Sequence, residues 1–114
     1  MSLLMKATVV DSISNEQAQR DIEQTMRRLS DIAAKVSHAK ASYTIISGNY
    51  NFIGYIDLSF RNTEDAEGFN PYTAINALQY AKSALPKWSW GISGFNYKRI
   101  NGDTWRINIG RFST

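Results

Sequence analysis

Residues 88–112, "WSWGISGFNYKRINGDTWRINIGRF", hold all three tryptophans of the 114-residue chain and interleave aromatic residues with Lys98, Arg99, Arg106 and Arg111. The stretch has two interpretations. Aromatic rings and cations on one exposed surface are typical of a platform on which nucleic-acid bases stack. Alternating apolar and polar residues around a glycine-containing turn indicate a β-hairpin. The register of the two strands separates these interpretations, because it decides which side chains share a face.

The turn of this hairpin is predicted at residues 100–102, with Gly102 in a left-handed bulge conformation. A shorter turn of Asn101 and Gly102 alone would mix apolar and charged side chains on both faces. The three-residue loop separates them and brings opposite charges together across the strands, which is stabilising. It predicts three cross-strand pairs: Tyr97 with Trp105, Phe95 with Ile107, and Arg99 with Asp103.

This register places most of the aromatic side chains in the core and the cations on the reverse face, next to asparagines. Only Trp90 and Phe112 fall on the basic face by parity. The stretch as a whole is therefore predicted to be a hairpin and not a stacking platform. The predicted core face comprises Phe95, Tyr97, Trp105, Ile107 and Ile109, and the predicted outer face comprises Asn96, Lys98, Thr104, Arg106 and Asn108.

A second hairpin is predicted over residues 42–60, turning at Gly48 and Asn49. A two-residue loop pairs Ile45 with Phe52 and Tyr43 with Gly54, so that the tyrosine ring covers the bare glycine. The apolar face is predicted to hold Phe52, Ile56, Leu58 and Phe60, and the opposite face to hold Ile53, Tyr55, Asp57, Ser59 and Arg61.

Two amphipathic helices separate these strands. Residues 14–38 begin with a capping-box pair, Ser14 and Gln17, and carry an apolar stripe at spacings of three and four residues. Residues 71–85 begin at Pro71 after the N-cap Asn70. A strand is predicted at residues 3–10, and residues 61–71 are predicted to form a polar loop. The stripe of the first helix is Ala18, Ile22, Met26, Leu29, Ala33 and Val36.

The element order β-α-β-β-α-β-β predicts a single α+β domain spanning residues 1–114. Strands with one strongly apolar face and amphipathic helices favour a mostly antiparallel five-stranded sheet with both helices on one face. The first six elements match a ferredoxin-like, split β-α-β arrangement, and the fifth strand is expected beside the fourth at an edge. The sheet face away from the helices is where we expect function.

Composition limits the chemistry. The chain has no cysteine, so disulfides, thiol catalysis and cysteine-ligated metals are excluded. Its one histidine, His38, cannot form a histidine metal cluster, and Glu64, Asp65 and Glu67 lack the spacing of a calcium loop. We expect no cofactor and no metal. The early apolar run is too short and interrupted for a signal or a membrane span, so a cytoplasmic protein without a membrane partner is expected.

The charge of the chain is uneven. Residues 71–114 carry six basic residues against one acidic residue, whereas residues 43–70 carry a net charge of −3. Our leading hypothesis is a small non-enzymatic interaction module that self-associates or binds another protein through the open sheet face and the basic hairpin. A nucleic-acid-binding module using the same hairpin is the alternative. A small enzyme with Asp57 as general base is the remote alternative.

The candidate binding residues are the cations and aromatic rings of the C-terminal third that are expected outside the core. They are Lys87, Trp90, Lys98, Arg99, Arg106, Arg111 and Phe112.

Overall fold

The computed structural model describes residues 7–9, 16–47, 52–84, 91–92 and 94–113. The helices are α1 (Glu16–Ser37), α2 (Thr63–Glu67) and α3 (Pro71–Ala84). The strands are β1 (Ala7–Val9), β2 (Lys40–Ser47), β3 (Phe52–Ser59), β4 (Gly91–Ile92), β5 (Phe95–Asn101) and β6 (Thr104–Ser113).

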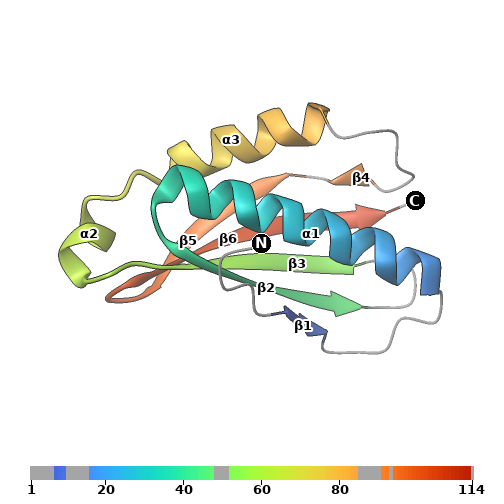
Figure 1. Cartoon of the computed structure of the whole chain (residues 1–114), viewed down its shortest axis with the longest axis horizontal. Coiled ribbons are helices and arrows are strands. Elements are labelled where there is room, and N and C mark those ends of the chain that lie inside the picture. The colour runs from blue at the N-terminus through green and yellow to red at the C-terminus, as the bar shows by residue number, and fades with distance from the viewer. Residues whose placement is uncertain (1–6, 10–15, 48–51, 85–90, 93, 114) are drawn as a thin grey trace.

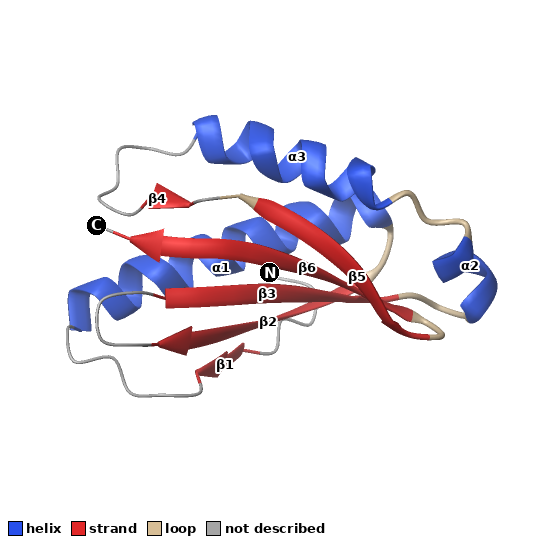
Figure 2. Cartoon of the chain, turned by 180° about the vertical axis from the view of Figure 1, so that it is seen from behind, coloured by secondary structure: helices blue, strands red, loops and turns tan. Residues whose placement is uncertain are grey.

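All six strands belong to one sheet with the order β1-β2-β3-β6-β4, and β5 also pairs with β6. Only the β1–β2 pairing is parallel. Helices α1 and α3 lie side by side over one face of the sheet (Figure 1), and the view from behind shows the other face in front of them (Figure 2). The prediction of an α+β fold with a mostly antiparallel sheet and helices on one face is confirmed.

The predicted number of strands is wrong. β4 and β5 pair with successive parts of β6, since Gly91 lies opposite Ser113 and Phe95 lies opposite Ile109. Together these two strands take the place of the predicted fourth strand, so the described residues contain six strands where five were expected.

The ferredoxin-like arrangement is also wrong. In a split β-α-β unit another strand separates the two parallel strands, whereas β1 lies directly beside β2 at the edge of this sheet. The last strand, β6, is not an edge strand but lies between β3 and β5. Burial explains this position: Ile107 and Ile109 of β6 are 0% and 1% exposed, and a strand this deeply covered is favoured in the interior of a sheet.

Both hairpins keep their predicted faces but differ from their predicted registers by two residues. Ile45 lies opposite Gly54, and Tyr43 lies opposite Ile56. The predicted register assumed a two-residue turn, but Ser47 pairs with Phe52, so the connection spans residues 48–51. Because side chains alternate with a period of two, this shift leaves Tyr55, Ile56, Asp57 and Leu58 on their predicted faces.

The C-terminal hairpin also differs by two residues, and its predicted turn is wrong: Asn101 pairs with Thr104, so residues 102–103 connect the strands, and Gly102 is not in the left-handed conformation. Tyr97 lies opposite Ile107 and Arg99 lies opposite Trp105, with a register shift between Arg99 and Asn101. The predicted Arg99–Asp103 pair is therefore wrong. Instead, Arg99 Nη2 donates a hydrogen bond of 2.6 Å to the carbonyl oxygen of Gly102.

The core lies between α1, α3 and the helix-facing side of the sheet. The apolar stripe of α1 is confirmed: Ile22, Met26, Leu29 and Ala33 are fully buried. The Tyr43 ring was predicted to cover Gly54, but Met26 lies there instead. A Cβ atom at Gly54 would lie 3.0 Å from Met26 Cε, so the methionine covers this glycine from the helix side.

The predicted polar loop contains the short helix α2. The side chain of Asn62 caps it by accepting a hydrogen bond of 2.8 Å from the Asp65 backbone N–H. Trp105 anchors it, because its Nε1–H donates a hydrogen bond of 2.7 Å to the Ala66 carbonyl oxygen. Ala66 is fully buried. The sequence signals for this helix are the capping asparagine and the two acidic residues of its first turn, Glu64 and Asp65.

Aromatic rings form a continuous chain from the surface to the core at this end of the molecule. Tyr72 contacts Tyr97, Tyr97 contacts Trp105, Trp105 contacts Phe69, and Phe69 contacts Phe60, with centroid distances of 4.8–5.9 Å. A hydrogen bond with the Tyr72 side chain raises the pKa of Tyr97. Trp105 is half-buried, so it joins the core less completely than predicted.

The contact between Met26 and Gly54 gives a test of this packing. Gly54→Val should lower the free energy of unfolding by about 1–3 kcal/mol through overpacking. Met26→Ala should lower it by about 2–5 kcal/mol. In the double variant the valine fills part of the vacated space, so the total loss should be smaller than the sum by about 1 kcal/mol. Urea unfolding measures all three variants.

The matched control is Gly68→Val, because a Cβ at Gly68 meets no atom closer than 3.6 Å. It should cost less than Gly54→Val. Additive losses for Met26→Ala and Gly54→Val would contradict this packing.

Candidate interaction face of the sheet

Figure 2 shows the sheet face opposite α1 and α3, here called the open face. The strand registers place polar residues on this face in regular rows. Within the described part of the chain, no helix covers it. One row crosses four strands as Ser42, Asp57, Arg106 and Lys98. The next row is Thr44, Tyr55, Asn108 and Asn96, and beyond it Ile46 lies opposite Ile53.

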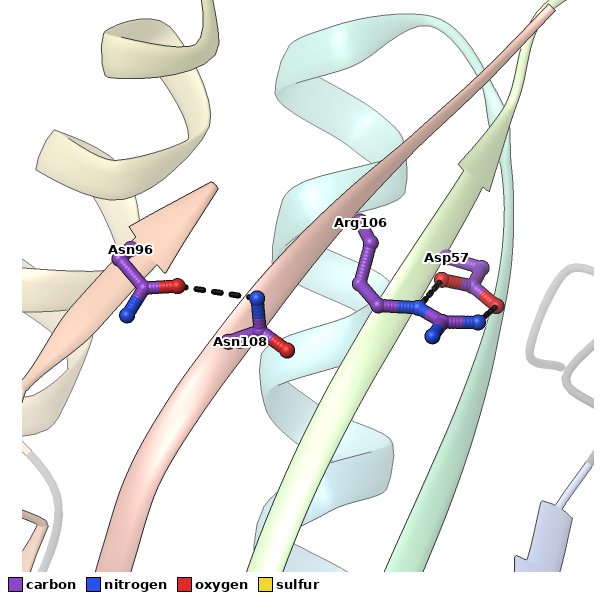
Figure 3. Close-up of polar contacts among 4 residues, drawn as sticks. All are labelled: Asp57, Asn96, Arg106 and Asn108. Atoms are coloured by element: carbon purple, nitrogen blue, oxygen red, sulfur yellow. Dashed lines mark hydrogen bonds and ion pairs between the residues drawn. The ribbon is translucent and has the colours of Figure 1, made fainter. Parts of the chain in front are cut away.

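Asp57 and Arg106 form a bidentate ion pair at the centre of the open face (Figure 3). Arg106 Nε donates to Asp57 Oδ1 at 2.7 Å, and Arg106 Nη2 donates to Asp57 Oδ2 at 3.0 Å. The side chains are 30% and 20% exposed, so the pair is screened less than one in open solvent. Hydrogen bonding by Asp57 raises the pKa of Arg106.

Strand pairing explains why these two residues meet. Asp57 and Arg106 lie directly opposite each other in the β3–β6 ladder, and Lys98 lies opposite Arg106 on the other side, in β5. Like charges directly across a ladder repel each other. The Asp57 carboxylate offsets this repulsion and draws the guanidinium toward β3.

Tyr55 holds the Arg106 guanidinium from a second direction. The Arg106 Cζ atom lies 3.7 Å from the centroid of the Tyr55 ring, a cation–π contact. Two residues of β3, Tyr55 and Asp57, therefore fix one arginine of β6. The result is a cluster of a carboxylate, a guanidinium and an aromatic ring in mutual contact, which we call the Arg106 cluster.

A side-chain hydrogen bond continues the polar surface toward β5. Asn108 Nδ2 donates to Asn96 Oδ1 at 2.9 Å, across the β5–β6 ladder (Figure 3). Lys98 is exposed beside it, and no ion pair involving Lys98 occurs among the described residues. The open face thus combines a fixed cluster in the middle with an unpaired cation toward the β5 edge.

The structure brings together only some of the predicted binding residues. Lys98 and Arg106 share the open face, as predicted. Arg99 pairs with Trp105 and so lies on the helix-facing side, where its Nε is buried without a hydrogen-bond partner. Lys87 and Trp90 lie outside the described residues.

Arg111 and Phe112 belong to β6, but their side chains lie outside the described part of the structure. Phe112 pairs with Phe52 beyond a register shift that falls between Phe52 and Gly54. The parity argument that placed Phe112 on the basic face does not extend past this shift.

The sequence did not indicate the Arg106 cluster. Alternation placed Tyr55, Asp57 and Arg106 on one face, but it could not show that β3 pairs with β6. The cluster also occupies the carboxylate that was considered as a general base. Both oxygens of Asp57 accept hydrogen bonds from Arg106.

No protein-family model matches this chain, and no curated protein resembles it in sequence. Among the described residues, no group of three or more acidic, histidine or cysteine side chains is placed to hold a metal ion. None of the described helices has the length and apolar character needed to cross a membrane.

The Arg106 cluster should contribute measurably to stability. Asp57→Ala should lower the free energy of unfolding by about 1–3 kcal/mol, because it leaves a half-buried guanidinium without its acceptor and opposite Lys98. A double-mutant cycle with Arg106→Ala in urea should give a coupling energy of about 1 kcal/mol. High salt should reduce that coupling.

The control is Arg61→Ala, which removes the pair between Arg61 and Asp65 at 3.1 Å. Those side chains are 83% and 42% exposed, so the loss should be below about 0.5 kcal/mol. If Asp57→Ala costs no more than Arg61→Ala, the cluster is not a structural feature of the folded protein.

Proposed function

We propose that this protein is a small non-enzymatic interaction module that self-associates through the open face. The observation that carries the proposal is the Arg106 cluster, which lies at the centre of a sheet face that no described element covers. Arginine and tyrosine are enriched at the centres of protein interfaces. Because Arg106 is already fixed by Asp57 and Tyr55, docking onto it orders few additional side chains.

The size of the open face suits a second copy of the chain. The molecule measures 42 × 27 × 26 Å, and the sheet spreads across the two longer directions (Figure 1). A face bounded by those dimensions has room for the roughly 800 Å² per partner that a standard interface buries. Ile53, 48% exposed on this face, adds apolar surface.

The charge order along the central row favours a two-fold arrangement. Asp57 lies on one side of Arg106 and Lys98 lies on the other. A two-fold axis along β6 exchanges the positions of β3 and β5 between copies, so Lys98 of each copy faces Asp57 of the other. The contacts between Lys98 and Asp57 are then self-complementary, as an isologous dimer requires, and the two Arg106 side chains that face each other on the axis are each paired with Asp57 of their own copy. Asp57 retains lone pairs for this contact after binding Arg106.

The alternative of nucleic-acid binding has less support. A phosphate that approached Arg106 would meet the Asp57 carboxylate, which already binds the guanidinium. Arg99 lies on the other face and binds a backbone carbonyl. Among the described hairpin cations only Lys98 is both exposed and unpaired. A single phosphate contact gives only weak binding, with a shallow salt dependence.

Sedimentation of single variants tests the dimer. The parent protein should sediment as a dimer at micromolar concentration, and Lys98→Glu should raise the dissociation constant about tenfold or more, because it places like charges opposite Asp57. Arg28→Glu is the control: it makes the same charge change on the exposed surface of α1, on the other side of the sheet, and should leave the dimer intact.

A monomeric parent at these concentrations would overturn the proposal, as would a dimer that Lys98→Glu does not weaken. A parallel titration with single-stranded RNA and DNA at low salt tests the alternative. Binding that Lys98→Glu abolishes, in a protein that stays monomeric, would assign the open face to nucleic acid.

A further inference from the structure

A second site lies at the end of the molecule where α1 stops and β2 begins, away from the centre of the open face. Here a cleft of about 820 Å³ opens between the last turn of α1, the start of β2 and the segment that follows β3. His38 and Phe60 line it, and both residues also line a neighbouring cleft of about 550 Å³ beneath α2.

Every charged side chain that lines the larger cleft is a cation. Lys35 comes from α1, Lys40 from β2, and Arg61 from the segment before α2, and no acidic side chain is among its described lining residues. The lysines are exposed, and neither takes part in an ion pair within the described part of the chain. Arg61 contacts Asp65 through one nitrogen in an exposed pair, which a second anion can share.

His38 adds a further polar group, in an unusual backbone conformation. Its φ angle is +52°, in the left-handed region, which glycine usually occupies at the end of a helix. The Ala39 backbone N–H donates a hydrogen bond of 3.2 Å to the Ala34 carbonyl oxygen. This bond spans His38 and ends the helix. Glycine would be less strained here, and this position instead places a histidine in the lining of the cleft.

The floor of the cleft is apolar. Phe60 is 8% exposed, and Ala34 and Ala39 complete this surface between the cations. Ser59 also lines the cleft, and a serine hydroxyl can donate a hydrogen bond. The lining therefore suits a ligand with a strongly anionic head and an apolar body.

We propose that this cleft binds a phosphate monoester that carries an aromatic or other apolar group. A phosphate monoester has close to two negative charges at neutral pH and three acceptor oxygens. Three cations on three different segments match such a head better than they match a monoanionic carboxylate. The apolar substituent would pack on the floor that Phe60 forms.

The experiment uses the whole chain and phenyl phosphate as the probe. Because His38 is the only histidine, its imidazole gives an isolated NMR signal in the lining of the cleft. Phenyl phosphate should shift this signal saturably at low salt, and inorganic phosphate should bind several-fold more weakly because it lacks the apolar group. Benzoate should also bind more weakly than phenyl phosphate.

Variants locate the site. Lys35→Ala with Lys40→Ala should weaken phenyl phosphate binding by about tenfold or more, because two charged donors are lost. Lys82→Ala removes the same charge from the last turn of α3, at the opposite end of the molecule (Figure 1), and should leave binding unchanged. Isothermal titration calorimetry measures both variants.

His38→Gly separates a ligand-binding role from a structural one. It should raise the melting temperature by a few degrees, because glycine relieves the left-handed strain, while it weakens phenyl phosphate binding about threefold or more. The absence of a saturable shift, undiminished binding in the double lysine variant, or unchanged binding in His38→Gly would each overturn the proposal. Equal affinity for benzoate would overturn the phosphate assignment.

Discussion

The pairing of β6 with strands on both of its sides is the constraint on which the rest of the structure depends. β6 joins β3, from the middle of the chain, to β5, the strand that precedes it. Its odd-numbered residues, Ile107 and Ile109, lie under the helices with almost no exposure. Its even-numbered residues then point to the other face, where Arg106 stands between Asp57 and Lys98. The core and the candidate interaction face are therefore two sides of one strand, and a slip of one residue would destroy both.

The same strand fixes the end of the molecule through Trp105. This ring pairs across the ladder with Arg99, packs against Phe69, and donates a hydrogen bond to the backbone of α2. The short helix is too small to bury a core of its own, so we infer that this contact holds it against the sheet. α2 in turn carries Glu64 and Asp65, which line the smaller cleft, and Asp65 contacts Arg61 at the edge of the larger one. Through α2, the position of the Trp105 side chain thus influences the lining of the smaller cleft and the Arg61 side chain of the larger one.

Local patterns predicted the faces of the strands, the stripe of α1 and the start of α3. The period of two residues in a strand and of 3.6 residues in a helix can be recognised from residues that are close together in the sequence. These patterns did not predict which strands pair. Registers that differ by two residues place the same side chains on the same face. The alternation of apolar and polar residues therefore could not distinguish the observed registers of the two hairpins from the predicted ones. The β3–β6 ladder joins residues about fifty positions apart, and no local signal encodes it. The Arg106 cluster depends on that ladder, so only its individual residues, and not their contacts, could be predicted.

The basic C-terminal third illustrates how charge in a sequence differs from charge on a surface. Its excess of cations suggested one continuous binding surface, but the fold distributes the described ones. Arg106 is bound to a carboxylate from the acidic middle segment, and Arg99 is turned to the helix side. Meanwhile Lys35, Lys40 and Arg61, which belong to segments with little or negative net charge, gather around one cleft beside His38. Net charge along the chain is an average over neighbours in sequence, whereas a ligand meets neighbours in space. Among the described residues, the end of α1 therefore brings together two exposed and unpaired cations, Lys35 and Lys40, whereas the C-terminal hairpin has one, Lys98.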